Sequence, residues 1–192
     1  MMLDPHRTAL VLIDLQKAIV GRELRPRSGN DVLSAAIKLA RRFREVGAPV
    51  VQVHVGWSQD RGDALQQPVD RPMPRPSNDA ADFSEFAEGL VQPTDIIIKK
   101  RQWGAFYGTE LDLQLRRRDI STLILGGIAT NFGVESTARA AWEHGYHIIF
   151  AEDATSSMSA EMHAFPYCEI FPRLGNISST DAILGMLPAK AA

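Results

Sequence analysis

Two charged residues stand at the ends of short apolar segments, the position at which α/β proteins often carry their reactive residues. Asp14 directly follows the run TALVLI, and Lys100 ends the run DIIIKK. An aspartate at the edge of an apolar core is partly desolvated, which raises its pKa unless a cation lies close by. An Asp–Lys pair can hold a reactive group and move protons. The open alternative is that Asp14 merely caps the next turn and that Lys100 is a solvated charge.

A third candidate is the stretch GGIATNFGVESTAR (126–139), which predicts a strand–turn–helix corner. Such corners often carry a nucleophile, but the centre of this one is Asn131-Phe132-Gly133 and holds no attacking group. Amides at a helix N-terminus can bind an anion or a carbonyl oxygen where glycine permits close approach. The alternative is a tight turn that needs its glycine only for packing.

The elements that must position these residues are predicted from continuous apolar runs rich in β-branched residues. Such runs are typical of strands covered on both faces, as in a parallel sheet. The predicted strands are 8–13, 49–55, 95–100, 121–127 and 147–153, with a sixth at 174–178. Helical patterns alternate with them at 30–47, 109–119, 134–145 and 178–188. We therefore predict an α/β fold, with a doubly wound, mostly parallel sheet of five or six strands and helices on both faces. Ligands of such sheets bind beyond the carboxyl ends of the strands, where the three candidates are expected to meet.

Local signals refine this scheme. Asn30 is the predicted N-cap of the first long helix and Gly47 its end. Glu135 and Arg139 stand four apart on one helical face, which predicts a structural ion pair. The irregular, Pro-rich stretch 56–82 is long for a compact domain, so we expect a cover over the site or a subunit contact.

The composition narrows the class of protein. A chain of 192 residues with 45% hydrophobic residues suits one domain, placed here at 8–187. A formal net charge of −2 gives no case for nucleic-acid binding, and no apolar run approaches the roughly 18 residues of a membrane span. The single cysteine, Cys168, excludes an internal disulfide and a multi-Cys zinc site, and its apolar neighbours favour a small core residue. We expect a cytoplasmic protein.

The segments VLIDLQ, KRQWGAFYGTEL and GGIATNFGVESTARAAWEHG, in this order, resemble the isochorismatase-like, or cysteine hydrolase, superfamily. That family includes isochorismatases, nicotinamidases and N-carbamoyl amidohydrolases. The resemblance covers residue 8 to about 187 and implies a Rossmann-like three-layer sandwich. It also implies a small-molecule substrate and a homo-oligomer, either a dimer or a tetramer.

The family's usual triad of Asp, Lys and Cys is incomplete in this chain. By resemblance, Asp14 and Lys100 match the first two members, and Gly133 stands at the cysteine position. Without a thiol at 133, a thioester intermediate cannot form there, which disfavours amidase chemistry. The nicotinamidase metal signature is absent too, so we predict no metal and no cofactor, and interpret His54 as a satisfied strand histidine.

True isochorismatases also lack a functional thiol at this position and hydrolyse a vinyl ether. The resemblance implies that the aspartate protonates the vinyl carbon and that water captures the oxocarbenium ion. We therefore predict a cysteine-independent hydrolase with Asp14 as general acid/base and Lys100 as its partner. The alternative is a catalytically inactive protein that retains the fold and binds a small molecule.

The predicted substrate contacts follow from the same three segments. The resemblance also implies a cis peptide bond between Ile128 and Ala129. Phe106 and Trp103 are equally open to a packing role, and Asn131 is first a helix-cap candidate. The residues predicted to contact substrate are Gln16, Trp103, Phe106, Ile128, Ala129, Thr130, Asn131 and Phe132.

Overall fold

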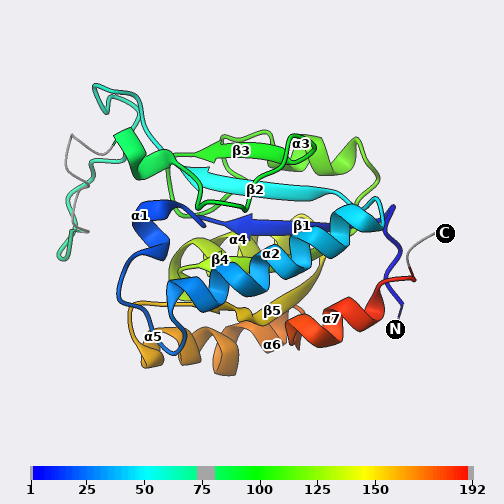
Figure 1. The fold of residues 1–192 in the computed structure, drawn as a ribbon. Helices are drawn as coiled ribbons and strands as arrows, with labels where there is room; N and C mark the ends of the chain where they lie inside the picture. Colours follow the sequence, from blue (N-terminus) through cyan, green and yellow to red (C-terminus); the bar gives the residue numbers. More distant parts are fainter. Residues whose placement is uncertain (1, 73–80, 190–192) are drawn as a thin grey trace.

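The computed structural model describes residues 2–72 and 81–189, and their fold is a six-stranded sheet with helices on both sides (Figure 1). The strands are β1 (Thr8–Ile13), β2 (Val50–Val55), β3 (Ile96–Lys100), β4 (Thr122–Ile128), β5 (His147–Ser156) and β6 (Asn176–Ser178). Their order is β3-β2-β1-β4-β5-β6, and every neighbouring pair is parallel. The predicted α/β class and the sixth strand are therefore confirmed.

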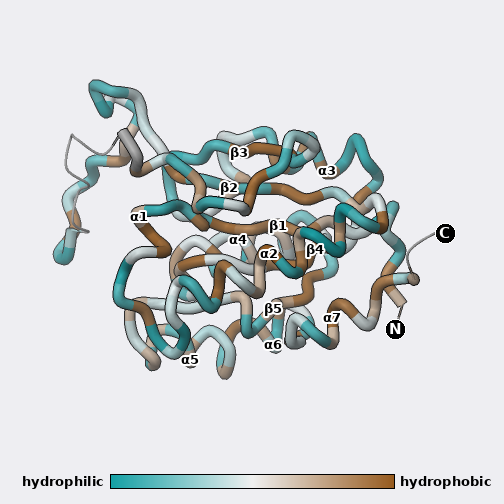
Figure 2. Tube along the Cα trace, viewed as in Figure 1, coloured by the Kyte–Doolittle hydropathy of each residue, from teal (hydrophilic) through white to brown (hydrophobic). Residues whose placement is uncertain are grey.

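The centre of the sheet is apolar on both faces. All six residues of β1 are buried. Leu10 and Leu12 join the core on one face, while Val11 and Ile13 join the core on the other. This alternation explains why the run TALVLI is continuously apolar rather than alternating. Figure 2 shows the same pattern, with hydrophobic colour concentrated in the central strands.

The helices divide between the two faces. Helices α1 (Lys17–Val20), α2 (Gly29–Glu45) and α7 (Thr180–Met186) pack on the face that buries Leu10 and Leu12. Helices α3 (Leu111–Arg116), α4 (Glu135–Glu143) and α6 (Phe171–Leu174) pack on the other. Short elements complete the chain: η1 (Ala81–Ser84), the π-turns η2 (Thr130–Val134) and η3 (Pro166–Ile170), and α5 (Ala160–Phe165). No helix of the described ranges is long and apolar enough to cross a bilayer.

Several predicted boundaries were wrong. The N-cap of α2 is Ser28 and not Asn30, because Ser28 and Asp31 form a reciprocal capping box in which each side chain accepts from the other's backbone amide. The helix predicted at 109–119 is shorter and begins at Leu111, and β5 continues past residue 153 to Ser156. Of the stretch 56–82, residues 56–72 form no helix or strand, and the prediction for residues 73–80 falls outside the described part of the chain.

Cys168 does not lie in the core. It is exposed on the π-turn η3, where the chain turns between α5 and α6 and directs the thiol to solvent. Of its apolar sequence neighbours, Phe171 is buried on the neighbouring helix, whereas Phe165 is exposed.

The sheet has its switch point between β1 and β4. From β1 the chain continues outward to β2 and β3 on one side, and from β4 to β5 and β6 on the other. Asp14 follows β1 and the Gly133 corner follows β4, so both lie at the carboxyl edge of this central pair. Gly127 permits the approach of β4 to β1: its φ is +122°, and a Cβ built on it would lie 2.1 Å from the Ile13 carbonyl oxygen.

Replacing this glycine tests how tightly the central pair is packed. We expect Gly127→Ala to lower the free energy of unfolding by about 3–5 kcal/mol, since overpacking adds to an unfavourable φ. Gly145→Ala is the matched control, because Gly145 also has a positive φ (+82°) but nothing within 4 Å of a built Cβ. The control should cost about 1–2 kcal/mol. Urea denaturation measures both values, and equal losses would contradict the close approach.

Candidate active site

Asp14 and Lys100 form a buried ion pair at the carboxyl edge of the sheet. The distance from Lys100 Nζ to Asp14 Oδ2 is 2.7 Å. Asp14 is 7% exposed and Lys100 only 1%. Lys100 Nζ also donates to the Trp103 carbonyl oxygen at 2.5 Å. The structure thus brings together the two charges that the sequence placed at separate strand ends.

The length of lysine matters for this pairing. Asp14 follows β1 and Lys100 ends β3, with β2 between them. Neighbouring strands lie about 4.8 Å apart, so the lysine must span roughly two such spacings. The register places Lys100 opposite Val55, beyond the level of Ile13 and Val53. A four-carbon side chain from that position reaches the carboxylate, which a shorter cation would not.

The environment of Asp14 favours its neutral form. Burial raises the pKa of this carboxyl, and the neighbouring Lys100 ammonium opposes that rise. One carboxyl oxygen, Oδ2, meets the lysine. The other, Oδ1, is buried and has no hydrogen-bond partner among the described residues. A buried oxygen without a partner costs free energy in the folded protein, and a ligand that bonds to it would recover that cost.

Gly133 lies directly against this pair. A Cβ built on it would be 3.0 Å from Asp14 Oδ2, 3.1 Å from Lys100 Nζ and 2.8 Å from Ile13 Cγ2. The three predicted catalytic positions therefore converge on one point. The π-turn η2 carries the corner, and the amides of Phe132 and Val134 both donate to the Ala129 carbonyl oxygen. Those two amides are thus engaged within the corner.

Gln16 was predicted to orient a substrate, but its amide is used inside the fold. It is fully buried, and its Nε2 donates to the carbonyl oxygens of Val55 and Phe83. Its Oε1 accepts from the Val55 amide at 2.7 Å. Gln16 therefore ties β2 to the segment before α1, which leaves its side chain no group to offer a ligand.

Two of the predicted aromatic residues have different surroundings. Trp103 is 52% exposed, and its ring lies 4.8 Å from the half-buried ring of Phe132. Because Trp103 also supplies the carbonyl that binds Lys100, this pair borders the site. Phe106 is buried in the core beside Tyr146, and its ring also stacks on that of the exposed His144, so it packs rather than lines the site.

The residues between β4 and Gly133 are mostly structural. Ile128 and Ala129 are buried in the core, and the peptide bond between them is cis. The Thr130 hydroxyl is buried and bonded to Ser156 and His163. Asn131 does not cap the helix, since its side-chain oxygen instead accepts from the Ser157 hydroxyl at 2.5 Å.

Some residues that support the site went unpredicted. The buried Thr137 hydroxyl donates to the Gly133 carbonyl at 2.7 Å and accepts from the Ala105 amide at 3.2 Å. It therefore joins the corner to the segment after Lys100. A threonine four residues after Gly133 within a helical pattern is a signal for this bond to the i−4 carbonyl. The predicted Glu135–Arg139 pair is present at 2.9 Å.

The contacts of His54 are with the backbone and an aromatic ring. The His54 Nδ1 lies 3.0 Å from the Ser84 carbonyl oxygen, and its ring packs near Phe86. Among residues 2–72 and 81–189, no three His, Cys, Asp or Glu side chains are grouped to hold a metal ion.

Removal of the Lys100 charge should reveal how much free energy the buried Asp14 carboxylate costs the folded protein. We expect Lys100→Met to raise the pKa of Asp14 further and to cost about 3–5 kcal/mol at neutral pH. Because the pKa of Asp14 is higher in the folded protein than the 3.8 of the unfolded chain, the free energy of unfolding falls as pH rises from 3.8 to the folded-state pKa. The stability that Lys100→Met loses should therefore be smaller in acid. Carboxyl NMR titration and urea denaturation at several pH values measure this. Lys99→Met, at an exposed neighbour, is the control; equal effects of both changes would contradict the assignment.

Comparison with known proteins agrees with this architecture. The isochorismatase domain family matches residues 8–182. The chain is 49% identical to the isochorismatase family protein YecD of Escherichia coli O157:H7, over 96% of this chain and 98% of that protein. It is 30% identical to the ureidoacrylate amidohydrolase RutB of Methylobacterium radiotolerans, over 98% and 83%. A solved isochorismatase family protein from Burkholderia thailandensis superposes with a TM-score of 0.92 at 44% identity, over 96% and 97% of the chains. The chain belongs to the isochorismatase family.

Proposed function

We propose that the protein is a hydrolase of a small molecule that works without a cysteine nucleophile. Asp14 is its general acid/base, and Lys100 is the electrostatic partner of Asp14. The observation that carries the proposal is the buried Oδ1 of Asp14, which has no partner among the described residues and lies in a carboxyl whose pKa is raised by burial. A carboxyl whose pKa is raised takes up a proton more readily than an exposed one, and that proton can pass to a bound molecule.

The reaction class that suits this acid is hydrolysis of a vinyl ether. Asp14 gives its proton to the terminal vinyl carbon, and the ether oxygen stabilises the resulting oxocarbenium ion. Water then adds to the cationic carbon and loses a proton to the Asp14 carboxylate. The hemiketal so formed breaks its other C–O bond and yields a carbonyl compound and an alcohol. Lys100 limits the cost of the carboxylate that exists between the two proton transfers.

The position of Gly133 supports a water nucleophile over an enzyme nucleophile. It has no side chain to attack a substrate, and a Cβ there would crowd Ile13, Asp14 and Lys100.

RutB, a relative, is named an amidohydrolase, so amides remain the second class of substrate to test. The pair of the exposed Trp103 and the half-buried Phe132 is the proposed wall for the substrate, and the backbone of residues 128–133 its floor. Assembly as a dimer or tetramer stays a prediction.

A second candidate is a binding protein without turnover. The observation in its favour is that Asp14 and Lys100 are almost fully buried and already bonded to each other. A ligand would then contact only the aromatic pair and the corner. Tight binding of a compound that is never converted would support this candidate over the hydrolase.

Substitution of the acid tests the proposal. A panel of vinyl ethers, amides and carbamoyl compounds should yield a vinyl ether substrate for the wild type, with kcat/KM lowered at least a hundredfold in Asp14→Asn. Asp181→Asn is the control, because Asp181 is an exposed partner of Lys38 far from the site. Circular dichroism should show that both variants are folded. Undiminished turnover by a folded Asp14→Asn would remove Asp14 from the mechanism.

The pH dependence of the reaction should report the same carboxyl. Because the acid must carry its proton, we expect kcat/KM to decline as pH rises through the pKa of Asp14, which burial raises above the ordinary 3.8. Lys100→Met removes the charge that opposes the rise, so the declining limb should move to higher pH. If the declining limb stays at the same pH in Lys100→Met, Lys100 does not influence the pKa of the catalytic acid, which would contradict the proposed partnership.

A further inference from the structure

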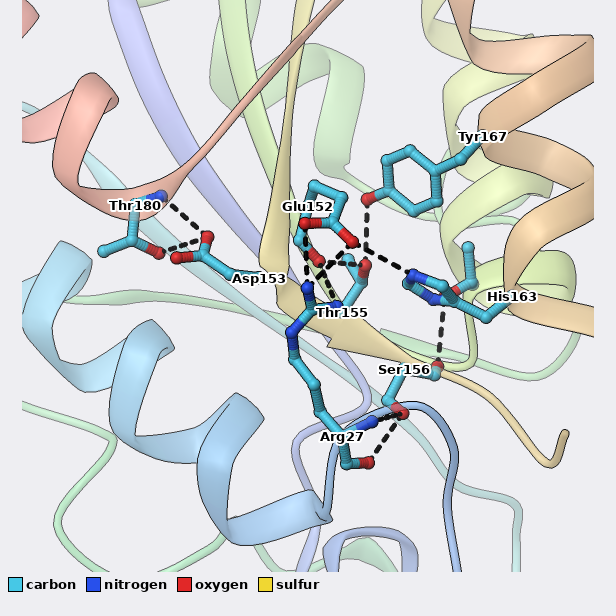
Figure 3. A network of polar contacts seen from close by, with 9 residues as sticks. Arg27, Glu152, Asp153, Thr155, Ser156, His163, Tyr167 and Thr180 are labelled. Carbon is cyan, nitrogen blue, oxygen red and sulfur yellow. Dashed lines mark hydrogen bonds and ion pairs between the residues drawn. The ribbon is translucent and has the colours of Figure 1, made fainter. Parts of the chain in front are cut away.

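A second polar network lies beside the corner, on β5, and the proposed reaction does not use it (Figure 3). The register of β4 and β5 passes from Leu125↔Phe150 to Gly127↔Thr155, so β5 advances by five residues where β4 advances by two. Such a bulge redirects side chains from the regular alternation. Figure 3 shows the result: Glu152 faces Arg27 and His163, whereas Asp153 faces Thr180 on the other side.

His163, on α5, joins this network to the corner. The residue is 5% exposed. Its Nε2 lies 3.3 Å from Glu152 Oε1, and its Nδ1 lies 2.9 Å from the Thr130 hydroxyl. That hydroxyl also lies 3.1 Å from the Ser156 carbonyl oxygen. Thr130 begins the π-turn that contains Gly133, so the contacts run unbroken from Glu152 to the corner.

Counting protons shows that these contacts depend on the charge of His163. The Thr130 hydroxyl has one hydrogen, and a carbonyl can only accept. When Thr130 donates to Ser156, it must accept from a protonated Nδ1, and Nε2 then also needs a proton to donate to Glu152. All three bonds therefore exist only with the imidazolium. A neutral His163 with its proton on Nε2 keeps the bond to Glu152, but Thr130 must then turn its hydrogen from Ser156 to Nδ1.

We propose that His163 is a positioning residue for the Gly133 corner, which it holds against the end of β5 through the Thr130 hydroxyl. Protonation of His163 allows all three bonds at once. Deprotonation breaks one of them: the bond from Thr130 to Ser156 if the remaining proton is on Nε2, or the bond to Glu152 if it is on Nδ1. The role in catalysis rests on the function proposed above, whereas the coupling of His163 to Gly133 does not. His163 itself touches neither Asp14 nor Lys100 among the contacts of the described residues, so its effect on them is indirect.

The groups around His163 determine the pH range in which it takes up a proton. Burial lowers its pKa below the ordinary value of 6.5, the Glu152 carboxylate raises it, and Arg27 lowers it. Arg27 holds both oxygens of Glu152, at 2.9 and 2.8 Å, so the carboxylate is shared between the two cations. Tyr167, on η3, has its ring 4.9 Å from His163 and its hydroxyl bonded to Thr155. The η2 turn brings no ionisable side chain.

NMR of the free protein tests the coupling without a substrate. We expect the imidazole nitrogens of His163 and the backbone amide of Gly133 to shift with one common midpoint below pH 6.5. In Thr130→Val the hydroxyl link is gone, so the Gly133 amide should cease to follow His163. Thr130→Ser keeps the hydroxyl and should restore the common midpoint. The imidazole of His54, which contacts Ser84 instead, should titrate alike in all three proteins.

Kinetics on any substrate found above then test the positioning role. We expect His163→Gln to lower kcat about ten- to a hundredfold with little change in KM, since misplacement of the reacting groups costs rate. We also expect the pH profile of kcat to have an inflection at the His163 midpoint in the wild type. This inflection should vanish in His163→Gln and Thr130→Val and return in Thr130→Ser. A Gly133 amide that ignores His163 in the wild type, or still follows it in Thr130→Val, overturns the inference. A common midpoint in a protein that turns nothing over would uphold the coupling while the proposed hydrolase fails.

Discussion

The site depends on one interaction, the buried ion pair between Asp14 and Lys100. Removing two charges from water is costly, and their attraction compensates only when the geometry is good and the strands around them are fixed. The pair joins the end of β1 to the end of β3 across β2, so it requires three strands to end at matching levels. Gln16 secures that match by bonding to both backbone groups of Val55, the residue opposite Lys100. The geometry of the Asp14–Lys100 pair and the sheet register are thus one constraint.

The sequence was sufficient to predict most of the architecture because the central strands β1 and β4 are buried almost throughout and are nearly continuously apolar. Asp14 and Lys100 were found for the same reason, since a charge that ends such a run must lie at the sheet edge. Side-chain partners were predicted less well. Gln16 has the right type and place for a substrate contact, but one of its partners is the Phe83 carbonyl, 67 residues away. Phe106 follows Lys100 closely, but the chain turns it into the core, against His144. Distant partners of this kind leave no periodic signal in a single sequence.

Two connections hold the corner in place from opposite sides. Thr137 binds the Gly133 carbonyl and reaches the segment after Lys100 through the Ala105 amide. Thr130 reaches β5 and His163 on the other side. Both are buried hydroxyls, and each has a single proton to donate, so each fixes a direction as well as a distance. The corner that faces Asp14 is therefore set by hydrogen bonds on both flanks.

The absence of a side chain at 133 changes what the acid can do. If a cysteine stood there, as the family resemblance implies for thiol-dependent members, its Cβ would lie within 3.1 Å of both Asp14 Oδ2 and Lys100 Nζ, and Ile13 would have to move. The charges would then serve to activate the thiol. With glycine, the two charges close on each other, and Oδ1 of Asp14 stays buried without a partner among the described residues. When a carboxyl in that position takes up a proton on Oδ1, it can donate that proton to a ligand. In the proposed mechanism, this one missing side chain replaces covalent attack by proton transfer.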